Sequence, residues 1–151
     1  MPLTYRDAVP SDLPFIVGLV VEDSVIPTGD DPADSMAPDY VAALAALTGD
    51  PNNRMIVAEL DGSPIGTLQM TFIPGLMRRG MWRLLLEQVH IAASHRSRGF
   101  GGEMIRWAIA EGRARNCGMV QLTSNKKRLD AHRFYERLGF LKSHEGFKYY
   151  L

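Results

Sequence analysis

The chain has 151 residues, the length of one ordinary globular domain, and we expect a single domain over residues 1–151. Apolar residues make up 46% of the chain and charged residues 23%, a balance that excludes intrinsic disorder. Seventeen lysines and arginines balance seventeen aspartates and glutamates. This neutrality argues against a protein whose main role is to bind nucleic acid or an anionic membrane.

The first half of the chain predicts one strand, two helices and three further strands. Leu3–Ala8 alternates as an opening strand. Ser11 stands where an N-cap is expected, before an apolar run with helical spacing that extends from Leu13 to Val20. Pro27–Asp34 is a loop by its proline, glycine and aspartate content. The remaining elements of this half are a helix at Tyr40–Leu47 and strands at Arg54–Leu60, Pro64–Phe72 and Trp82–Ile91, with a hairpin turn at Asp61–Gly62.

The second half of the chain alternates helices and strands. A glycine-rich turn at Arg98–Gly102 leads into a helix at Glu103–Ala114, and Met119–Thr123 is the next strand. The last expected elements are a helix at Asp130–Leu138 and two short strands at Phe140–Ser143 and Phe147–Leu151. The order is strand, two helices, three strands, helix, strand, helix and two strands. It predicts a mixed α/β (α+β) sheet that is antiparallel at first and crosses over through helices later.

The segment from Glu87 to Met104 carries the strongest functional signal. A strand ends there, a short basic loop follows, and the glycine-rich stretch Gly99–Gly102 opens a helix. Such a junction directs several backbone N–H groups toward one point, where the helix dipole adds positive potential and Arg96 and Arg98 add charge. This pattern predicts a site for a pyrophosphate. The alternative interpretation is a turn whose glycines only satisfy backbone geometry.

Two motifs in the second half are similar to those of a known family. Arg96–Gly101 matches the pattern R/Q-x-x-G-x-G/A, and Ala131–Phe140 is similar to A-x-x-[FL]-Y-E-x-x-G-F. With these motifs and the expected order of elements, the chain resembles the GCN5-related N-acetyltransferase (GNAT) family over nearly its whole length. Its C-terminal segment also resembles the aminoalkylphosphonate N-acetyltransferase branch of that family.

The resemblance implies a GNAT fold in which acetyl-CoA, the co-substrate, lies between two splayed central parallel strands, Trp82–Ile91 and Met119–Thr123. The chain would then be an acyltransferase that moves the acetyl group to the primary amine of a small molecule by direct attack, through a tetrahedral intermediate. Tyr135 would protonate the departing thiolate and Glu87 would take the proton of the amine; the structural alternatives are a packed aromatic and a surface carboxylate. The residues implied to bind acetyl-CoA are Val89, His90, Ile91, Arg96, Arg98, Gly99, Phe100, Gly101, Gly102, Asn125, Arg128 and Phe134, and no metal is expected.

The base and some of the CoA contacts stay open at this point. Strict strand alternation places Glu87 on one face and His90 on the other, but a bulge would break that parity and admit His90 as the base. A water chain is the third alternative. The asparagine that commonly precedes the second motif is replaced by Arg128. Asn125, Lys126 or Arg128 is therefore expected to contact CoA, unless the two cations belong to a solvated basic loop.

The sequence does not name the acceptor amine. Acidic residues between Glu22 and Asp34 would suit a cationic amine such as a polyamine. Arg78 and Arg79 would suit an amine that also carries a phosphonate or a carboxylate. Two other classes of function stay open, namely a protein acetyltransferase that modifies a lysine or an N-terminus, and a non-catalytic acyl-CoA sensor.

Cellular setting and assembly are further expectations. The single cysteine, Cys117, is interpreted as a structural thiol and can form no internal disulfide. The first residues lack the apolar stretch of a signal peptide and no window approaches a membrane span, which predicts a cytoplasmic protein. Many members of the family pair through their last strands, so the resemblance implies a homodimer formed through Phe147–Leu151, without a nucleic acid or membrane partner.

Overall fold

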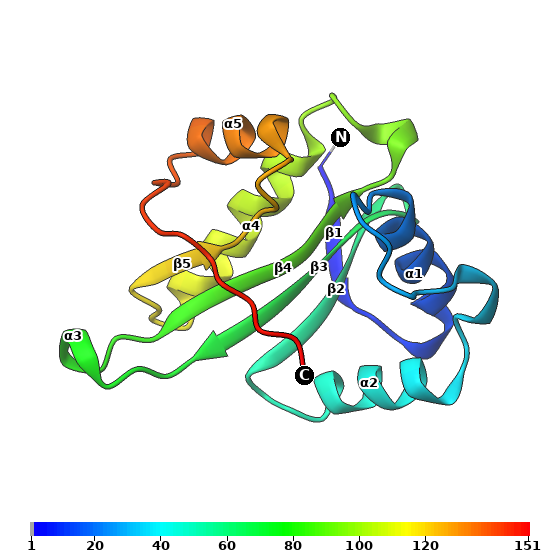
Figure 1. The fold of residues 1–151 in the computed structure, drawn as a ribbon, viewed down its shortest axis with the longest axis horizontal. Coiled ribbons are helices and arrows are strands. Elements are labelled where there is room, and N and C mark those ends of the chain that lie inside the picture. The colour runs from blue at the N-terminus through cyan, green and yellow to red at the C-terminus, as the bar shows by residue number, and fades with distance from the viewer. Residues whose placement is uncertain (1) are drawn as a thin grey trace. The chain divides into compact units, whose positions relative to one another are not determined.

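The computed structural model describes residues 2–151, and Figure 1 shows their secondary structure. The chain divides into two compact units, of which the first ends at Gln121 and the second comprises Leu122–Leu151. A five-stranded sheet has the order β1-β2-β3-β4-β5. Its strands are β1 Thr4–Asp7, β2 Asn53–Leu60, β3 Ser63–Ile73, β4 Arg83–Ile91 and β5 Met119–Leu122. The helices are α1 Leu13–Glu22, α2 Pro38–Thr48, the short α3 Met77–Gly80, α4 Phe100–Ala114 and α5 Leu129–Arg137, with 3-10 turns at Pro10–Asp12, Pro32–Asp34 and Ala93–His95.

The sheet is mixed, as the sequence predicted. Neighbouring strands from β1 to β4 pair antiparallel. The crossover through α4 brings β5 beside β4, where the Gly118 N–H donates to the Trp82 carbonyl at 2.8 Å just before both strands begin. The two strands therefore run parallel from that contact. Because β5 has only four residues and β4 has nine, the later half of β4 extends beyond the end of β5.

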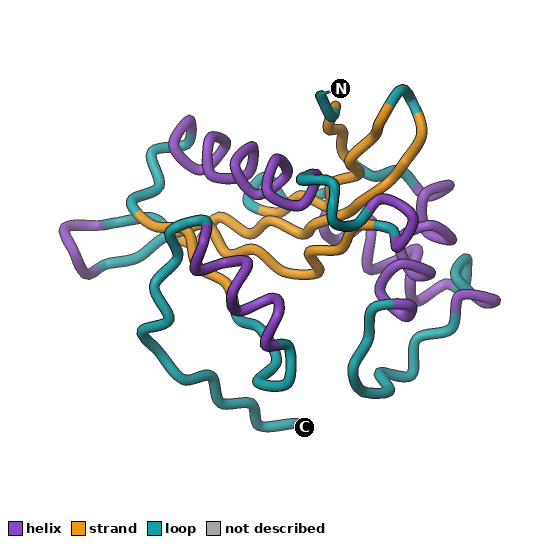
Figure 2. Tube along the Cα trace, turned by 90° about the horizontal axis from the view of Figure 1, so that it is seen from above, coloured by secondary structure: helices purple, strands orange, loops and turns teal. Residues whose placement is uncertain are grey.

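Helices of the first unit cover both faces of the sheet (Figure 2). α4 packs on the face that carries Leu84, so closely that a Cβ on Gly112 would lie 3.2 Å from the Leu84 side chain. α1 and α2 pack on the opposite face, where side chains from both helices enclose Met55 and Val57 of β2. The apolar cluster on this face contains the buried residues Ala8, Leu13, Ile16, Leu44, Met55 and Val57.

Several local signals in the sequence are confirmed. The hairpin turn between β2 and β3 has positive φ at both Asp61 and Gly62, as the two-residue turn of a tight hairpin requires. α2 ends at Thr48 and is followed by Gly49, which caps it by donating its N–H to the Ala45 carbonyl at 2.9 Å. The predicted N-cap is wrong, because Asp12 rather than Ser11 directly precedes α1. Ser11 lies instead inside a 3-10 turn, where the Asp12 carboxylate accepts the Val9 N–H at 2.8 Å.

The two closing strands expected at Phe140–Ser143 and Phe147–Leu151 are the main error in the predicted fold. Both segments are described by the structure, and within residues 2–151 neither belongs to a strand. The backbone gives the reason at one point, since the Ser143 N–H donates to the Leu141 carbonyl at 3.0 Å and closes a tight turn where an extended strand was expected. Strand propensity alone, without a neighbouring strand to pair with, does not make a sheet.

Candidate active site

A β-bulge interrupts β4 at the segment that the sequence singled out. Thr67 of β3 is paired with His90, and Gln69 with Glu87. Between these two pairs β3 advances by two residues and β4 by three, so β4 contains one extra residue. Gln88, within the bulge, has a φ of 50°. A left-handed φ is uncommon for a residue with a side chain, and it is tolerated where the surrounding structure fixes the backbone.

The bulge places both candidate bases on the same face of the sheet. Thr67 and Gln69 are two residues apart and share one face, and cross-strand partners share a face too. Glu87 and His90 therefore both lie on the face covered by α1 and α2. The strict alternation expected for β4 is wrong for this pair, and the bulge considered as its alternative is confirmed.

His90 is held between two polar partners, whereas Glu87 is exposed to solvent. His90 Nδ1 lies 2.7 Å from Asp23 Oδ2 at the end of α1, and His90 Nε2 lies 3.2 Å from Gln88 Oε1. Only 10% of the His90 side chain is exposed. A carboxylate only accepts hydrogen bonds, so His90 donates Nδ1–H to Asp23. Its Nε2 then either donates to the Gln88 oxygen, as an imidazolium would, or accepts from the Gln88 amide in the flipped orientation.

The glycine-rich turn opens α4 as predicted, but the helix begins earlier than the sequence indicated. α4 begins at Phe100 instead of Glu103, so Phe100, Gly101 and Gly102 form its first turn. Ser97 and Gly99 both have left-handed φ, 60° and 86°. Within the described residues, no side chain caps this helix end. Its first N–H groups are therefore available to an anion.

The two arginines of the first motif have different surroundings. Arg98 lies over the ring of Phe100, with its guanidinium carbon 5.1 Å from the ring centroid. Arg96 turns back toward β4, where its Nε donates to the Ile91 carbonyl at 2.9 Å. Its Nη2 lies 3.5 Å from Glu22. Arg96 therefore joins the end of β4 to the acidic end of α1, and Arg98 is the more open of the two cations.

The second motif forms a capped helix end in the second unit. The Gly139 N–H donates to the Glu136 carbonyl at 3.0 Å and the Phe140 N–H to the Tyr135 carbonyl at 3.1 Å, with φ of 98° at Gly139. This is a Schellman cap, which requires a residue that tolerates a left-handed φ. The Tyr135 ring lies edge-on between Phe134 and Phe140, with ring centroids 5.1 and 5.7 Å away. The glycine and phenylalanine of the motif thus fix the orientation of Tyr135.

The basic loop before α5 is organised by Asn125. Its Oδ1 accepts the Lys127 N–H at 2.9 Å and its carbonyl accepts the Arg128 N–H at 3.0 Å. His132 of α5 also places Nε2 2.9 Å from the Asn125 carbonyl. The side-chain oxygen of Asn125 is thus used within its own loop. The predicted site residues are divided between the units: Glu87 through Gly102 belong to the first, and Asn125, Arg128, Phe134 and Tyr135 to the second.

A cavity of about 240 Å³ lies beside the bulge, on the face of the sheet that α1 and α2 cover. Its polar lining residues are Asp30, Tyr40, Gln69 and Gln88, and its apolar lining residues are Leu13, Ile16, Val17, Val20, Ala43, Leu44, Leu47 and Met55. Sequence reasoning missed the two glutamines, although each interrupts an apolar strand segment, Gln69 between Leu68 and Met70 and Gln88 before Val89.

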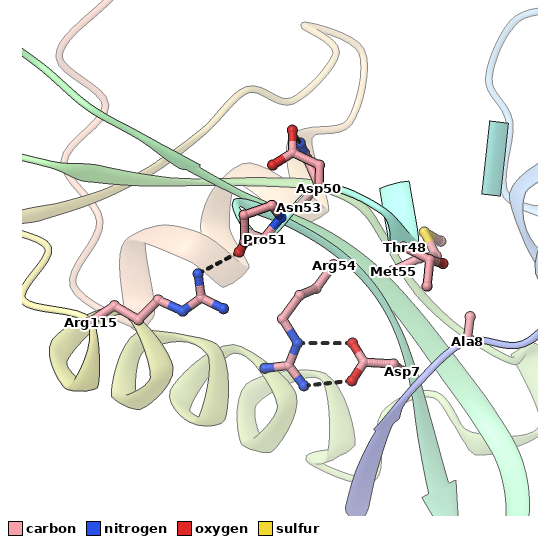
Figure 3. Close-up of a pocket in the computed structure, with 9 residues that line it drawn as sticks. All are labelled: Asp7, Ala8, Thr48, Asp50, Pro51, Asn53, Arg54, Met55 and Arg115. Atoms are coloured by element: carbon pink, nitrogen blue, oxygen red, sulfur yellow. Dashed lines mark hydrogen bonds and ion pairs between the residues drawn. The ribbon is translucent and has the colours of Figure 1, made fainter. Parts of the chain in front are cut away.

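A second cavity, of about 310 Å³, lies elsewhere in the first unit (Figure 3). Its two arginines are already engaged. Arg54 is paired with Asp7 at 2.9 Å and with Glu111 at 3.0 Å, and Arg115 donates to the Pro51 carbonyl at 2.8 Å. These contacts tie β1 and β2 to α4. None of the residues predicted for catalysis or CoA binding lines this cavity.

The mixed sheet with its bulged β4, the glycine-rich start of α4 and the capped tyrosine helix together define an acyl-CoA-dependent transferase. The model of the Acetyltransferase (GNAT) family matches residues 20–140. An aminoalkylphosphonate N-acetyltransferase from Salmonella typhimurium (strain LT2) is 32% identical over 114 residues, which cover 72% of each chain. The chain belongs to the GNAT family and is an acetyl-CoA-dependent acetyltransferase.

Two solved structures extend this similarity to the whole fold. A protein described as a transcriptional regulator from Bacillus halodurans C-125 is 37% identical, with a TM-score of 0.92 and 99% of each chain covered. A protein assigned as an acetyltransferase from Agrobacterium tumefaciens str. C58 is 28% identical, with a TM-score of 0.81, over 98% of this chain and 99% of that one. In residues 2–151, no three His, Cys, Asp or Glu side chains gather to hold a metal ion, and no helix has the length and apolarity to cross a membrane.

Proposed function

We propose that the protein transfers the acetyl group of acetyl-CoA to the primary amine of a small molecule. The bulge in β4 carries this proposal. Gln88 and Val89 have no cross-strand partner on β3 within the described chain, and a bulge of this kind re-aims side chains beside active sites. The same bulge turns Gln88 toward a cavity of about 240 Å³, the size of pocket that suits a small amine better than a peptide chain.

Acetyl-CoA would be held along β4 and at the start of α4. The backbone of Val89 and Ile91 would pair with the pantetheine arm, and the amide of Val89 or His90 would stabilise the oxyanion of the tetrahedral intermediate. The residues fit this ligand, since no described side chain caps the first turn of α4. The N–H groups of Gly99–Gly102 would hold the pyrophosphate together with Arg98 and Arg96. In the second unit, Asn125, Arg128 and Phe134 would supply further contacts.

The reaction needs one acid and one base. The neutral amine attacks the thioester carbon and forms the C–N bond, the C–S bond breaks, and the thiolate takes the phenol proton of Tyr135. Glu87 takes the proton that the amine nitrogen loses, and exchange with water restores both groups. His90 is the second candidate base, because it lies on the same face as Glu87 and Asp23 fixes its ring. Each proton transfer of this kind contributes roughly 10²–10⁴-fold in rate.

The protein is also proposed to form a homodimer through its last residues. Phe147 and Tyr149 are 93% and 91% exposed, and large apolar side chains in such a row favour a protein partner. We expect the double variant Phe147→Ser/Tyr149→Ser to be a monomer by light scattering where the natural chain is a dimer. A natural chain that is monomeric at the same concentration would contradict this part of the proposal.

A thiol-release assay tests the reaction. The full chain is offered acetyl-CoA with a panel of diamines, monoamines, amino acids, aminoalkylphosphonates and lysine peptides. We expect CoA release with small amines. Tyr135→Phe is expected to lower kcat by roughly 10²–10⁴-fold while acetyl-CoA binding, measured by calorimetry, stays unchanged. Glu87→Gln and His90→Gln, measured side by side, identify the base as the residue whose loss removes the rise of kcat/KM with pH.

Tyr5→Phe is the matched control for the loss of one phenol hydroxyl. The Tyr5 ring stacks on Trp107 at 4.2 Å, and its buried hydroxyl has no hydrogen-bond partner among the described residues. Removing that hydroxyl is therefore expected to leave both stability and turnover unchanged. Equal losses of activity in Tyr5→Phe and Tyr135→Phe would contradict a catalytic role for Tyr135. Acetyl-CoA binding without turnover of any panel amine would favour an acyl-CoA sensor instead.

A further inference from the structure

The cavity beside the β4 bulge has a lining that selects among amines. Gln69 and Gln88 come from the sheet, and Asp30 and Tyr40 come from the α1–α2 connection and the start of α2. The other lining residues, from α1, α2 and β2, are aliphatic. Asp30 is the one charged group among the described residues that line this cavity, and none of them is a lysine or arginine.

The Asp30 carboxylate is fixed in place by hydroxyl groups. Tyr40 donates its hydroxyl to Asp30 Oδ1 at 2.9 Å, and Thr28 donates its hydroxyl to Asp30 Oδ2 at 2.6 Å. The Asp31 N–H in turn donates to the Tyr40 oxygen at 3.1 Å. Each carboxylate oxygen accepts one of these bonds and keeps a further lone pair. Neither hydroxyl neutralises the charge, so the carboxylate can still bind a cation.

The pKa of the Tyr40 phenol is consistent with this arrangement. The hydrogen bond from the Asp31 amide lowers that pKa, but desolvation, the hydrogen bond to Asp30 and the negative charges of Asp30 and Asp39 together outweigh it, and the net shift is upward. Tyr40 therefore stays protonated at neutral pH and keeps donating to Asp30. Asp30 thus lines the cavity with a carboxylate that forms no ion pair among the described residues.

All charged residues of the segment that covers the cavity are acidic. Nine of the seventeen acidic residues of the chain lie between Asp7 and Asn53, and no lysine, arginine or histidine does. This segment contains α1, the α1–α2 connection and α2. Such a layer attracts a cation to the cavity mouth and repels an anion.

Arginines outside this segment pair with four of its nine acids: Arg54 with Asp7, Arg6 with Asp12, and Arg96 with Glu22 and Asp23. None of these pairs includes Asp30. Arg96 is engaged with Glu22 and with the Ile91 carbonyl. Arg78 and Arg79 lie in α3, which Figure 1 shows at the far end of the β3–β4 hairpin from α1 and α2. A phosphonate or carboxylate on the acceptor would thus enter an acidic, largely aliphatic cavity without a cation to pair with.

We propose that the acceptor is an aliphatic diamine or polyamine whose second ammonium group binds Asp30 while its first amine reacts. This inference rests on the proposed acetyltransferase function and names its substrate class. It separates the chain from its Salmonella relative, whose named substrate carries an anionic phosphonate. The aliphatic lining contacts the methylene chain, and Gln88 at the bulge lies at the reacting end.

The test compares three acceptors of similar length: 1,4-diaminobutane, 1-aminobutane and 3-aminopropylphosphonate. We expect kcat/KM to fall in that order, with the diamine at least tenfold above the monoamine, since a hydrogen bond to a charged group contributes roughly 1.5–3 kcal/mol, about ten- to a hundredfold. Asp30→Asn is expected to raise the KM of the diamine about tenfold or more and to affect the KM of the monoamine much less. Asp39→Asn is the matched control, because it removes one charge from the same layer at an exposed residue outside the cavity.

The outcomes separate the two proposals. Faster turnover of 3-aminopropylphosphonate than of 1,4-diaminobutane would overturn the diamine inference and leave the acetyltransferase function intact. The diamine inference would also be overturned if Asp30→Asn changed the KM of the diamine and of the monoamine equally. It would be overturned as well if Asp30→Asn and Asp39→Asn changed the KM of the diamine equally. No CoA release with any of the three amines, together with no acetyl-CoA binding by calorimetry, would overturn both proposals. Calorimetry of 1,4-diaminobutane on the CoA-loaded protein measures binding for any variant with low turnover.

Discussion

Gly66→Ala tests whether the spacing between β3 and the later half of β4 is as tight as the structure indicates. Gly66 is paired with Ile91. A Cβ added there would lie 2.7 Å from Ile91 Cδ1 and 3.0 Å from the His90 carbonyl oxygen. The Ile91 side chain can rotate away, but the His90 oxygen belongs to the backbone. β4 must therefore shift by a few tenths of an ångström.

The expected cost is a net destabilisation of about 1 kcal/mol. Overpacking of a buried position costs roughly 1–3 kcal/mol, and the lower entropy of alanine in the unfolded chain recovers about 0.4–1 kcal/mol. For a chain of this length, that corresponds to a fall in Tm of roughly 2–4 °C. The same shift moves the backbone proposed to bind pantetheine, so acetyl-CoA affinity is expected to fall several-fold.

Gly18→Ala is the matched control for the same chemical change. Gly18 lies within α1, and none of the described atoms beyond its own helix backbone and chain neighbours lies within 4 Å of a Cβ built there. Alanine in a helix interior is better than glycine by roughly 0.5–1 kcal/mol, so this variant is expected to be more stable than the natural chain. Thermal unfolding and calorimetry with acetyl-CoA measure both variants. A Gly66→Ala protein with natural stability and affinity would refute the proposed packing of β4.

Four further predictions follow from single contacts. Arg6 lowers the pKa of Asp12 below its ordinary 3.8. The stability that this ion pair supplies is therefore present above pH 3.8 and lost as the pH falls through the pKa of Asp12 in the folded protein, so below pH 4 the urea midpoint of Asp12→Asn should fall less than that of the natural chain. Thr67→Val should cost about 1 kcal/mol in urea unfolding, because the buried hydroxyl donates to a β2 carbonyl at 2.8 Å. Gly139→Ala should cost about 1 kcal/mol of stability and lower kcat, because it strains the cap that orients the tyrosine helix. Burial raises the pKa of the Cys117 thiol, so iodoacetamide should label it more slowly at pH 8 than it labels free cysteine.

The order of the sheet strands and main helices as far as α5 could be predicted, because each depends on local signals. Three such signals are the Asp61–Gly62 turn, the apolar spacing of α1 and the glycine before α4. Each determines the backbone conformation of only a few neighbouring residues. The second motif is local too: its Gly139 and Phe140 are the Schellman cap of α5. A family pattern that is defined by sequence alone thus has a physical meaning in backbone geometry.

The bulge in β4 could be suspected but not located from the sequence. A left-handed φ is usually signalled by a glycine, but this position is Gln88. The register shift is visible only in the unequal pairing of β4 with β3. The contact between His90 and Asp23 joins residues 67 positions apart, so no spacing rule indicates it. The chemistry of the acceptor face depends on these long-range contacts, which is why the sequence left the base open.

The C-terminal strands show the opposite error, in which local propensity was given too much weight. Phe147, Tyr149 and Tyr150 have strand-forming side chains, yet the segment is exposed and outside the sheet. A strand needs a neighbouring edge as well as a suitable sequence. In the proposed homodimer, a partner chain would supply that edge. The expected strands would then form only when the dimer forms.

The net charge of zero does not show how charge is distributed along the chain. A sum over the whole sequence cancels two regions of opposite sign, because residues 7–53 carry nine of the acidic residues and none of the basic ones, while the remaining residues carry eight acidic and all seventeen basic ones. The proposed CoA contacts Arg96, Arg98 and Arg128 all lie in the basic part, and the acceptor cavity is covered by the acidic part. Such a separation of charge favours the binding of both a polyanionic donor and a cationic acceptor.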